Sequence, residues 1–417
     1  MPRIEPFRGI LYNNEKVDIS KVVAPPYDVI PLKMQDELYR LDAHNAVRLI
    51  LGKEEAGDSK DYNKYKRARE FFDKWLSENI LIEDKTPSIY VYSEEYSAGG
   101  AKKIQLGFIA AMKIEESSKV RPHENTFPKP KQDRLSLIRE VNANLSCIFT
   151  LFDDKNKKAE KILGAVISQR PLFNFEYDNV RHKLWRLGGR PQIDKLKKLM
   201  LKKEIFIADG HHRYEVARMY KEETGNEYVM TYFTPVSGKR LTILATHRLV
   251  KNIYTDIGDF IGKLRRYFNV EKIKSLDQLL KKMSAAKTSE YIFGVYFKDK
   301  VFYLLRLKPQ AAPNKLIKEK RSRAWKGLDV SVLHGVIFNR ILGLNDRVKD
   351  EDNIVYTRDP KEARKEVDKG GFDAAFFLNP TKVAQVRDIA RIGDKMPHKS
   401  TYFYPKLLSG LVINKLA

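Results

Sequence analysis

The segment that most constrains the fold is residues 205–215, where a short apolar run stops at Asp-Gly and a polar run begins. The apolar run is too short for a helix and is typical of a buried strand. After Gly210, apolar and aromatic residues recur with helical spacing until Gly225, which ends the predicted helix. The segment therefore predicts a strand followed directly by a helix, an arrangement typical of an α/β fold.

Polar groups gather at this predicted junction. Asp209, His211, His212 and Arg213 lie within five residues of one another. An opening helix offers unpaired N–H groups and a partial positive charge, and Gly210 allows close backbone approach, so an anion such as phosphate can bind there. The alternative is that the aspartate is only a helix cap and the histidines are surface residues.

A second group of functional residue types lies in residues 119–134, which contain Arg121, His123 and Glu124. Three prolines between positions 122 and 130 exclude a regular helix there, so the sequence predicts a loop. Glu124 beside His123 can take a proton from a hydroxyl group. The cations that could neutralise a phosphoryl group are Arg121, Lys129, Lys131 and Arg134. The alternative is a solvated basic loop.

Two further groups could reach the same anion. Lys399, Ser400 and Thr401 form a donor-rich segment, followed by an aromatic run that can anchor it. His247 and Arg248 follow the last predicted strand of the first domain and add an imidazole and a cation. The alternative for the first of these groups is a basic tail docked for stability.

Four motifs, R-P-H-E, D-G-H-H-R-Y-E, T-H-R and M-P-x-K-S-T-Y-F-Y-P-K, together resemble a widespread prokaryotic family catalogued as a domain of unknown function. The resemblance runs from P-F-R-G at residues 6–9 and A-P-P-Y-D at residues 24–28 to Ser409 and Gly410. It covers essentially the whole chain.

The D-G-H-H-R segment alone is similar to the ParB/sulfiredoxin-like superfamily, whose members include free serine kinases that form O-phosphoserine. This resemblance implies a ParB/sulfiredoxin-like core in which the motif lies against the phosphates and a separate glutamate acts on the serine hydroxyl. Glu124 is our candidate for that glutamate. The residues that match the phosphate-binding role by type are Asp209, His211, His212 and Arg213.

Composition sets outer limits on the class of protein. The chain has 417 residues, 42% of them hydrophobic, with 21 Tyr and 21 Phe, which indicates two or three globular domains. The sequence has no stretch long enough to span a membrane and no signal pattern, so we expect a cytoplasmic protein. The single cysteine, Cys147, excludes an intramolecular disulfide and is expected in the core rather than as a nucleophile.

The net charge of +24 is compatible with nucleic acid, with anionic metabolites or with a lysine-rich surface. No helix-turn-helix, zinc-finger or RNP signature accompanies the charge, and the lysine pairs at positions 157, 197, 202 and 281 are spread over predicted helix surfaces. Nucleic acid is therefore an unfavoured but open partner, no membrane partner is expected, and the oligomeric state is open.

Periodicity predicts two domains, residues 1–250 with the phosphate-binding core and residues 251–417, an α/β domain whose tail returns to the active cleft. The fold class is α/β with mixed sheets. The elements predicted in the first domain are a helix over 62–79, a hairpin of 88–96 and 103–114, a helix over 133–141, a strand over 147–152, helical stretches up to 204, and strands over 228–233 and 241–245. Those predicted in the second are helices over 256–267, 275–285, 330–342 and 360–368, a hairpin of 291–297 and 301–307, and strands over 354–357 and 372–378.

No glycine-rich phosphate loop is present, so a phosphoryl-transfer enzyme of this sequence must use another helix N-terminus plus cations. Our first hypothesis is a small-molecule kinase that transfers a phosphoryl group from ATP, ADP or pyrophosphate to a hydroxyl, with free L-serine as the acceptor that the resemblance implies. Glu124, or else Asp209, takes the proton, and Mg²⁺ is expected with the donor, with Asp209 as its ligand. A transition metal at the adjacent histidines is disfavoured, because neighbouring helical residues point in different directions.

The second hypothesis is a ParB-like nucleotide-binding switch whose charge serves DNA. The first hypothesis requires that Glu124, Asp209, Arg213 and Lys399 converge on one cleft.

Overall fold

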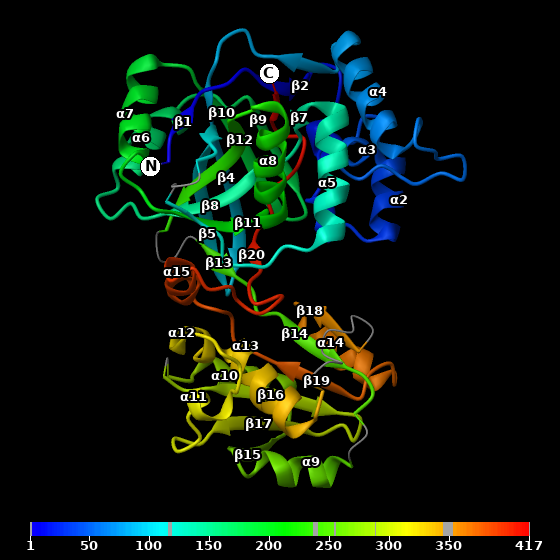
Figure 1. The fold of residues 1–417 in the computed structure, drawn as a ribbon, viewed down its shortest axis with the longest axis vertical. Helices are drawn as coiled ribbons and strands as arrows, with labels where there is room; N and C mark the ends of the chain where they lie inside the picture. Colours follow the sequence, from blue (N-terminus) through cyan, green and yellow to red (C-terminus); the bar gives the residue numbers. More distant parts are fainter. Residues whose placement is uncertain are drawn as a thin grey trace. The chain divides into compact units, whose positions relative to one another are not determined.

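The computed structural model describes residues 2–115, 119–236, 241–253, 256–287, 289–344 and 353–416. The chain forms two compact units (Figure 1). Unit 1 comprises Met1–Thr242 and Pro405–Ala417, and unit 2 comprises Ile243–Tyr404. We predicted a boundary at residue 250, whereas the strand that ends there belongs to unit 2.

Unit 1 is built around a nine-stranded mixed sheet. Its strands, in spatial order, are β6 (Val120–Arg121), β11 (Ile205–Asp209), β8 (Ile148–Phe152), β12 (Tyr228–Pro235), β5 (Ala101–Lys113), β4 (Ile89–Ala98), β10 (Val180–Leu187) and β9 (Phe173–Tyr177), with β1 (Ile4–Glu5) paired to β5. β6 runs parallel to β11 and β8 parallel to β12, while the other neighbours are antiparallel. The predicted α/β class with mixed sheets is confirmed.

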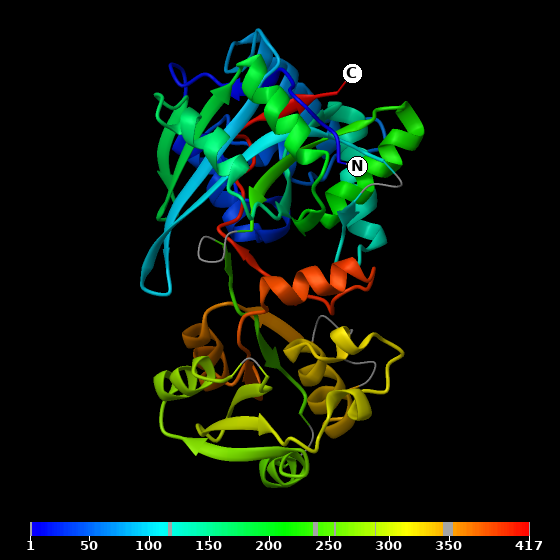
Figure 2. The same cartoon turned by 90° about the vertical axis from the view of Figure 1, so that its left-hand side faces the viewer.

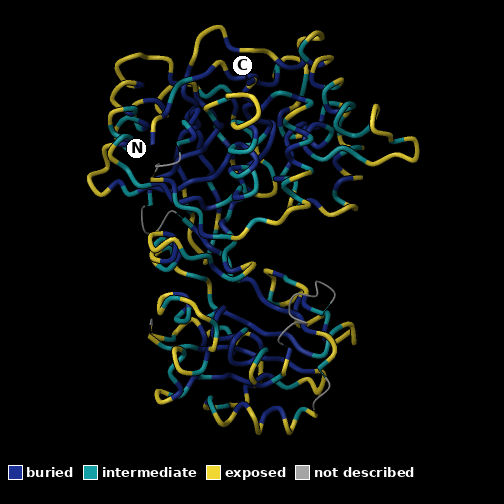
Figure 3. The backbone as a smooth tube through the Cα atoms, viewed as in Figure 1, coloured by how far each residue is buried: buried dark blue, intermediate teal, exposed yellow. Residues whose placement is uncertain are grey.

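One face of this sheet holds the main apolar core. Phe108 of β5 and Phe152 of β8 pack there with Leu163 of α6 (Lys158–Ile167) and Leu196 of α7 (Arg190–Met200). The strands are buried along most of their length and the outer helix surfaces are exposed (Figure 3). This burial explains why continuous apolar runs such as that of β11 form strands.

A smaller sheet of unit 1 joins both ends of the chain. Its order is β3 (Leu81–Glu83), β2 (Gly9–Tyr12), β21 (Ile413–Lys415) and β7 (Ala143–Asn144). The other helices of the unit are α1 (Ile19–Val22), η1 (Tyr27–Val29), α2 (Leu32–Leu41), α3 (Val47–Ile50), α4 (Lys64–Ser77), α5 (Pro128–Val141) and α8 (His211–Thr224). α5 packs against both α4 and α8, and Leu135 of α5 shares an apolar cluster with Val216 of α8 and Leu416 near the C-terminus.

Most elements predicted for unit 1 are confirmed. The helix predicted over 62–79 is α4, and the predicted hairpin is β4 and β5, whose light-blue strands extend beyond the rest of the sheet in Figure 2. The prediction that prolines exclude a helix up to residue 130 was wrong, because α5 begins at Pro128. Pro128 and Pro130 fall in the first turn, where no N–H needs an intrahelical partner.

Two other predictions for unit 1 need correction. The stretch before residue 204 is not wholly helical, because β9 and β10 form a hairpin between α6 and α7. The strand predicted over 241–245 does not complete the core sheet. Only β13 (Thr242–Ile243) forms there, and it pairs with β20 (Phe403–Tyr404) in a separate two-stranded sheet.

Unit 2 contains a six-stranded antiparallel sheet in the order β15 (Phe268–Ile273), β17 (Phe302–Leu307), β16 (Ile292–Phe297), β19 (Ala374–Phe377), β14 (His247–Val250) and β18 (Ile354–Thr357). Its helices are α9 (Ile257–Leu264), α10 (Leu276–Ser284), α11 (Pro313–Leu316), α12 (Arg323–Lys326), α13 (Asp329–Val332), the π-helix η2 (Leu333–Ile341), α14 (Pro360–Asp368) and α15 (Val383–Arg391). Every element predicted beyond residue 250 is present, with β18 and α14 at the predicted bounds.

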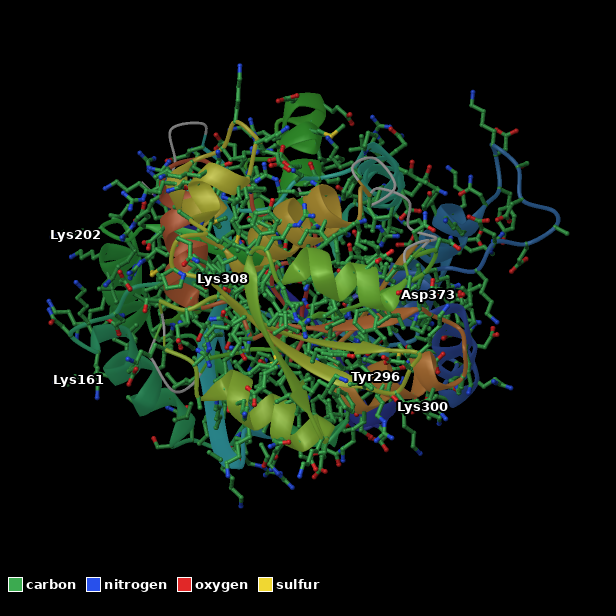
Figure 4. All side chains as sticks on the ribbon, turned by 90° about the horizontal axis from the view of Figure 1, so that it is seen from below. Lys161, Lys202, Tyr296, Lys300, Lys308 and Asp373 are labelled. Atoms are coloured by element: carbon green, nitrogen blue, oxygen red, sulfur yellow. The ribbon has the colours of Figure 1, made fainter. Side chains whose placement is uncertain are left out.

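The surface carries the excess of lysine. Lys161 of α6 and Lys202, which follows α7, are exposed on the surface of unit 1 and are labelled in Figure 4. Across the described residues, no helix combines the length and the apolar character that a bilayer crossing requires.

Candidate active site

The predicted strand-to-helix junction is confirmed. β11 ends at Asp209, and α8 begins at His211. Between them Gly210 has φ of +88°, a left-handed conformation that glycine adopts at little cost. A Cβ atom at this position would lie 3.0 Å from the guanidinium of Arg213, so the turn and the arginine require glycine together.

The R-P-H-E segment lies directly beside this junction. β6 pairs in parallel with β11, with Arg121 opposite Phe206, so the next residues pass the start of α8. The backbone N–H of His123 donates to Nε2 of His211 over 3.3 Å, although the two residues are 88 positions apart. Their rings are 4.6 Å apart and nearly perpendicular. The two motifs therefore form one site.

Glu124 lies at the centre of this site. Its carboxylate is 3.3 Å from Nδ1 of His211 and 3.9 Å from Nε2 of His123. Because Nε2 of His211 accepts a hydrogen bond, Nδ1 carries the ring proton and can donate it to Glu124. The side chain of Glu124 is 32% exposed, while that of His211 is 3% exposed. The carboxylate of Glu124 is therefore accessible to a substrate, whereas the imidazole of His211 is buried and held by the His123 N–H and by Glu124.

The charges around Glu124 keep it ionised. Burial by itself would raise the pKa of the Glu124 carboxyl, but the interactions with His211, His123 and Lys406 outweigh burial and hold the pKa well below its usual range. Glu124 is a carboxylate at neutral pH.

Asp209 is held by two cations from distant parts of the chain. Nη2 of Arg213 lies 2.9 Å from one carboxylate oxygen, and Nζ of Lys406 pairs with the other. Nη1 of Arg213 also donates to the carbonyl of Cys147. Burial raises the pKa of Asp209, but Lys406 and Arg213 outweigh it and lower the pKa. Lys406 comes from the C-terminal segment of unit 1, and we had not predicted it as a site residue.

His212 points away from Glu124 toward the end of the loop. The N–H of Phe127 donates to Nε2 of His212 over 2.9 Å, and the two rings are nearly parallel at 6.1 Å. Burial and the neighbouring His211 lower the pKa of His212, so its imidazole is neutral at pH 7. This arrangement confirms that the adjacent histidines project in different directions.

The A-P-P-Y-D turn also contributes to the site. Burial raises the pKa of Tyr27 to about 12, and Asp209 and Arg213 are near enough to influence that pKa. The guanidinium of Arg134 lies 4.1 Å from the centre of the Tyr27 ring. Arg134, which we proposed from the sequence as a phosphate ligand, therefore makes a cation–π contact with Tyr27 instead. The motif was visible in the sequence, but nothing local assigned it to this site.

Cys147 is buried, as predicted, and burial raises the pKa of its thiol to about 12. A thiol with that pKa is almost wholly protonated at pH 7, so it is a poor nucleophile.

The remaining predicted residues belong to the edge strand β6 or to unit 2. Arg121 interacts with Glu204 at 3.4 Å and makes no described contact with Asp209 or Glu124. His247 and Arg248 do not follow a core strand of the first domain but belong to β14 of unit 2, together with Lys399, Ser400 and Thr401 of that unit. A cleft shared by Lys399 with Glu124, Asp209 and Arg213 remains a prediction.

The described residues do not fit a magnesium site built by the protein alone. Both oxygens of Asp209 accept from cations, and no group of three or more His, Cys, Asp or Glu side chains with metal-binding geometry occurs among the described residues. Magnesium is normally bound through one or two carboxylates plus substrate phosphates. Asp209 as a Mg²⁺ ligand stays a prediction.

The family described as "protein of unknown function (DUF1015)" matches residues 4–331. The chain belongs to this DUF1015 family. The resemblance on which we predicted a family of unknown function is thereby confirmed. The matched range includes the R-P-H-E, D-G-H-H-R-Y-E and T-H-R motifs and ends before the C-terminal motif.

No curated protein matches the chain. A solved free serine kinase variant in complex with AMP is similar, with 12% identity, 68% of this chain and 84% of that chain covered, and a TM-score of 0.35. A conserved hypothetical protein from Pyrococcus furiosus has 14% identity, with 69% and 89% covered and a TM-score of 0.34. C-terminally truncated SbnI from Staphylococcus aureus has 10% identity, with 72% and 85% covered and a TM-score of 0.36. Because these likenesses are weak, the site of this DUF1015 protein is interpreted from its own contacts, and its ParB/sulfiredoxin-like core stays a prediction.

Proposed function

We propose that unit 1 of this DUF1015 protein is a phosphotransferase that moves a phosphoryl group from ATP, ADP or pyrophosphate to a small hydroxyl compound. The observation that carries the proposal is the position of Glu124. An accessible, ionised carboxylate lies against His211, the first residue of α8, beside a second carboxylate with two cations.

The start of α8 is suited to the phosphates of the donor. The N–H groups in the first turn of a helix lack intrahelical partners, and the helix dipole favours an anion there. α8 runs for 14 residues, from His211 to Thr224, so this dipole is well developed. Arg213 and Lys406 add two cations, and both can divide their hydrogen bonds between Asp209 and a phosphoryl oxygen.

Glu124 is suited to the acceptor. The acceptor oxygen forms a bond to phosphorus, the bond from phosphorus to the bridging oxygen of the donor breaks, and the hydroxyl proton passes to the carboxylate of Glu124. A carboxylate with a low pKa is a weak base. In phosphoryl transfer through a loose transition state, however, positioning and electrostatic stabilisation dominate, so the base mainly orients the hydroxyl.

Free L-serine is the acceptor that we propose, because the D-G-H-H-R motif resembles that of free serine kinases. The product would be O-phosphoserine.

The test is incubation of the purified protein and Mg²⁺ with ATP, ADP or pyrophosphate and free L-serine, followed by mass-spectrometric detection of O-phosphoserine. We expect product with the wild type and at least about a hundredfold lower turnover with Glu124→Gln, with donor binding nearly unchanged. The matched control is Glu223→Gln, the same change at a carboxylate that pairs with Arg139 toward the far end of α8.

Three results would count against the proposal. If Glu124→Gln is as active as Glu223→Gln, Glu124 is not the base, and Asp209→Asn becomes the informative variant. Loss of the nucleotide without a phosphorylated product favours the nucleotide-switch alternative. DNA retention that weakens in Arg213→Ala while both carboxylate variants stay active would replace the kinase with a binding protein.

A further inference from the structure

Arg248 is a buried cation in unit 2 with no carboxylate partner among the described residues. It is 1% exposed, which makes it one of the largest fully buried side chains of the chain. Its guanidinium donates from Nη1 to the carbonyl of Thr246 and from Nη2 to the carbonyl of Lys399, over 3.1 Å in the second case. Its Nε atom is buried and has no hydrogen-bond partner.

This arrangement is costly unless an anion is present. A guanidinium has five N–H donors and stays charged, and two neutral carbonyls satisfy only part of this capacity. Burial of a charge is unfavourable without a counter-charge, and arginine is the side chain best matched to the paired oxygens of a carboxylate or a phosphate.

The side chains next to Arg248 on the sheet are aromatic. Arg248 stands opposite Phe376 of β19 and Tyr356 of β18, and Phe376 packs on Phe338 of η2 at 5.0 Å. The ring of Tyr356 lies 5.5 Å from the guanidinium carbon of Arg248. The side of β14 that carries Arg248 is therefore the side covered by η2.

His334 of η2 adds a second unsatisfied group. Its Nε2 atom is buried and has no hydrogen-bond partner. Burial, Arg248 and His398 together lower the pKa of His334 to about 3. The ring of His334 lies 5.1 Å from that of Phe338, which packs on Phe376. A neutral imidazole of this kind can donate one hydrogen bond to an anion without adding charge.

The loop that contains Lys399 borders the same group. The ring of His398 meets that of Tyr356 edge to face at 6.0 Å, and the hydroxyl of Thr381 donates to the carbonyl of Ser400 over 2.7 Å. Lys399 itself has φ of +52°, a left-handed conformation that is uncommon outside glycine and that clusters at ligand-binding positions.

We propose that unit 2 holds its own oxyanion site, in which Arg248 and His334 bind a phosphate or carboxylate group beneath the loop around Lys399. The sequence had assigned Arg248 and Lys399 to the same anion as Asp209 and Arg213. Within unit 2, Arg248 donates to the carbonyl of Lys399, and His334 contacts Phe338, which packs on Phe376 opposite Arg248. This inference does not rest on the proposed phosphotransferase, because every residue of the site belongs to unit 2.

The test is peptide-resolved hydrogen exchange of the full chain in phosphate, acetate and chloride at equal ionic strength. We expect phosphate to slow exchange in residues 246–250 and 396–402 of the wild type, and acetate to do the same if a carboxylate group suffices. Arg248→Met should lose this protection, and Arg248→Lys should need at least about tenfold more phosphate, because lysine lacks the planar fork. Arg306→Met is the control, since Arg306 is an arginine of β17 that is ion-paired with Glu290.

The result that would overturn the proposal is equal protection in chloride and phosphate, or phosphate protection that survives in Arg248→Met. If Arg248→Met does not fold, Arg248→Lys decides between the same outcomes. Protection of residues 205–215 reports on the site of unit 1 separately, so failure of one site is distinguishable from failure of the other.

Discussion

Two arginines of this protein, Arg213, which is partly buried, and Arg248, which is buried, have opposite surroundings. Arg213 in unit 1 pairs with Asp209, which also pairs with Lys406, so charges of both signs are present. Arg248 in unit 2 meets two carbonyls, a tyrosine ring and a histidine, and no described carboxylate.

The difference is between a cation that the protein pairs with a carboxylate and a cation that has no carboxylate partner among the described residues. Removing one member of a buried ion pair leaves the other charge without a partner and lowers the free energy of unfolding. Removing a buried charge that has no partner leaves this free energy unchanged or raises it. Variants that change one charge at a time therefore test whether the two arginines differ in this way.

The largest effect is expected for Arg213→Met. The change leaves Asp209 with one cation and the carbonyl of Cys147 without its donor, so we expect unit 1 to lose roughly 3 to 5 kcal/mol of unfolding free energy. Urea unfolding followed by circular dichroism measures this loss. Arg139→Met is the control, because its pair with Glu223 is solvent-exposed and worth at most about 1 kcal/mol. Equal losses in the two variants would show that Arg213 is not part of a buried charge pair.

Glu94 extends the comparison to a carboxyl group without a cation. It is fully buried, Tyr92 and Gln105 donate to it, and burial raises its pKa to about 8. The pKa of Glu94 is higher in the folded than in the unfolded state. The contribution of Glu94 to the free energy of unfolding is therefore complete below pH 4.5 and is lost as the pH rises to about 8.

We therefore expect the wild type to lose roughly 3 kcal/mol more than Glu94→Gln between pH 5 and pH 8, measured as unfolding free energy. Glu95→Gln is the control, because the neighbouring Glu95 pairs with Lys183 and is partly exposed. Parallel pH curves for the wild type and Glu94→Gln would show that the carboxyl is not held neutral.

A smaller effect of opposite sign is expected for Glu124→Gln. The folded pKa of Glu124 lies below the unfolded value of 4.5, so its stabilisation is present above that pH and is lost as the pH falls. The wild type should lose about 1 kcal/mol more than Glu124→Gln between pH 6 and pH 3, a figure reduced for the partial exposure of the side chain. A steeper acid limb in Glu124→Gln than in the wild type would contradict this sign.

The smallest effect is expected for Arg248→Met in a buffer without oxyanions. A buried unbalanced charge is replaced by an apolar chain of similar length, so the unfolding free energy should change by less than about 1 kcal/mol or rise. Added phosphate should stabilise the wild type only. A loss as large as that of Arg213→Met would mean that the protein itself balances Arg248, and the two regions would then not differ.

Much of the site was visible in the sequence because it depends on local chemistry. Gly210 lies between an apolar run and a helical pattern, and these local signals are enough to predict the β11–α8 junction. β18 and α14 are predicted in the same way from periodicity and capping signals. The hairpin of β9 and β10 was missed although β9 alternates apolar and polar residues, and α5 was mispredicted because prolines are tolerated in a first helical turn.

The sequence by itself determined which residue types gather at the start of α8 and in the R-P-H-E loop. Three contacts follow from the three-dimensional fold: that of Glu124 with His211, that of Lys406 with Asp209, and the packing of η2, which carries His334, on the side of the sheet that carries Arg248. The physical reason is that local patterns fix secondary structure, whereas these contacts depend on the parallel register of β6 with β11, the return of the C-terminus to unit 1 and the packing of η2 on its sheet. Each of these three arrangements brings together residues that are far apart in the chain, so the spacing of the residues in the sequence does not predict the arrangement.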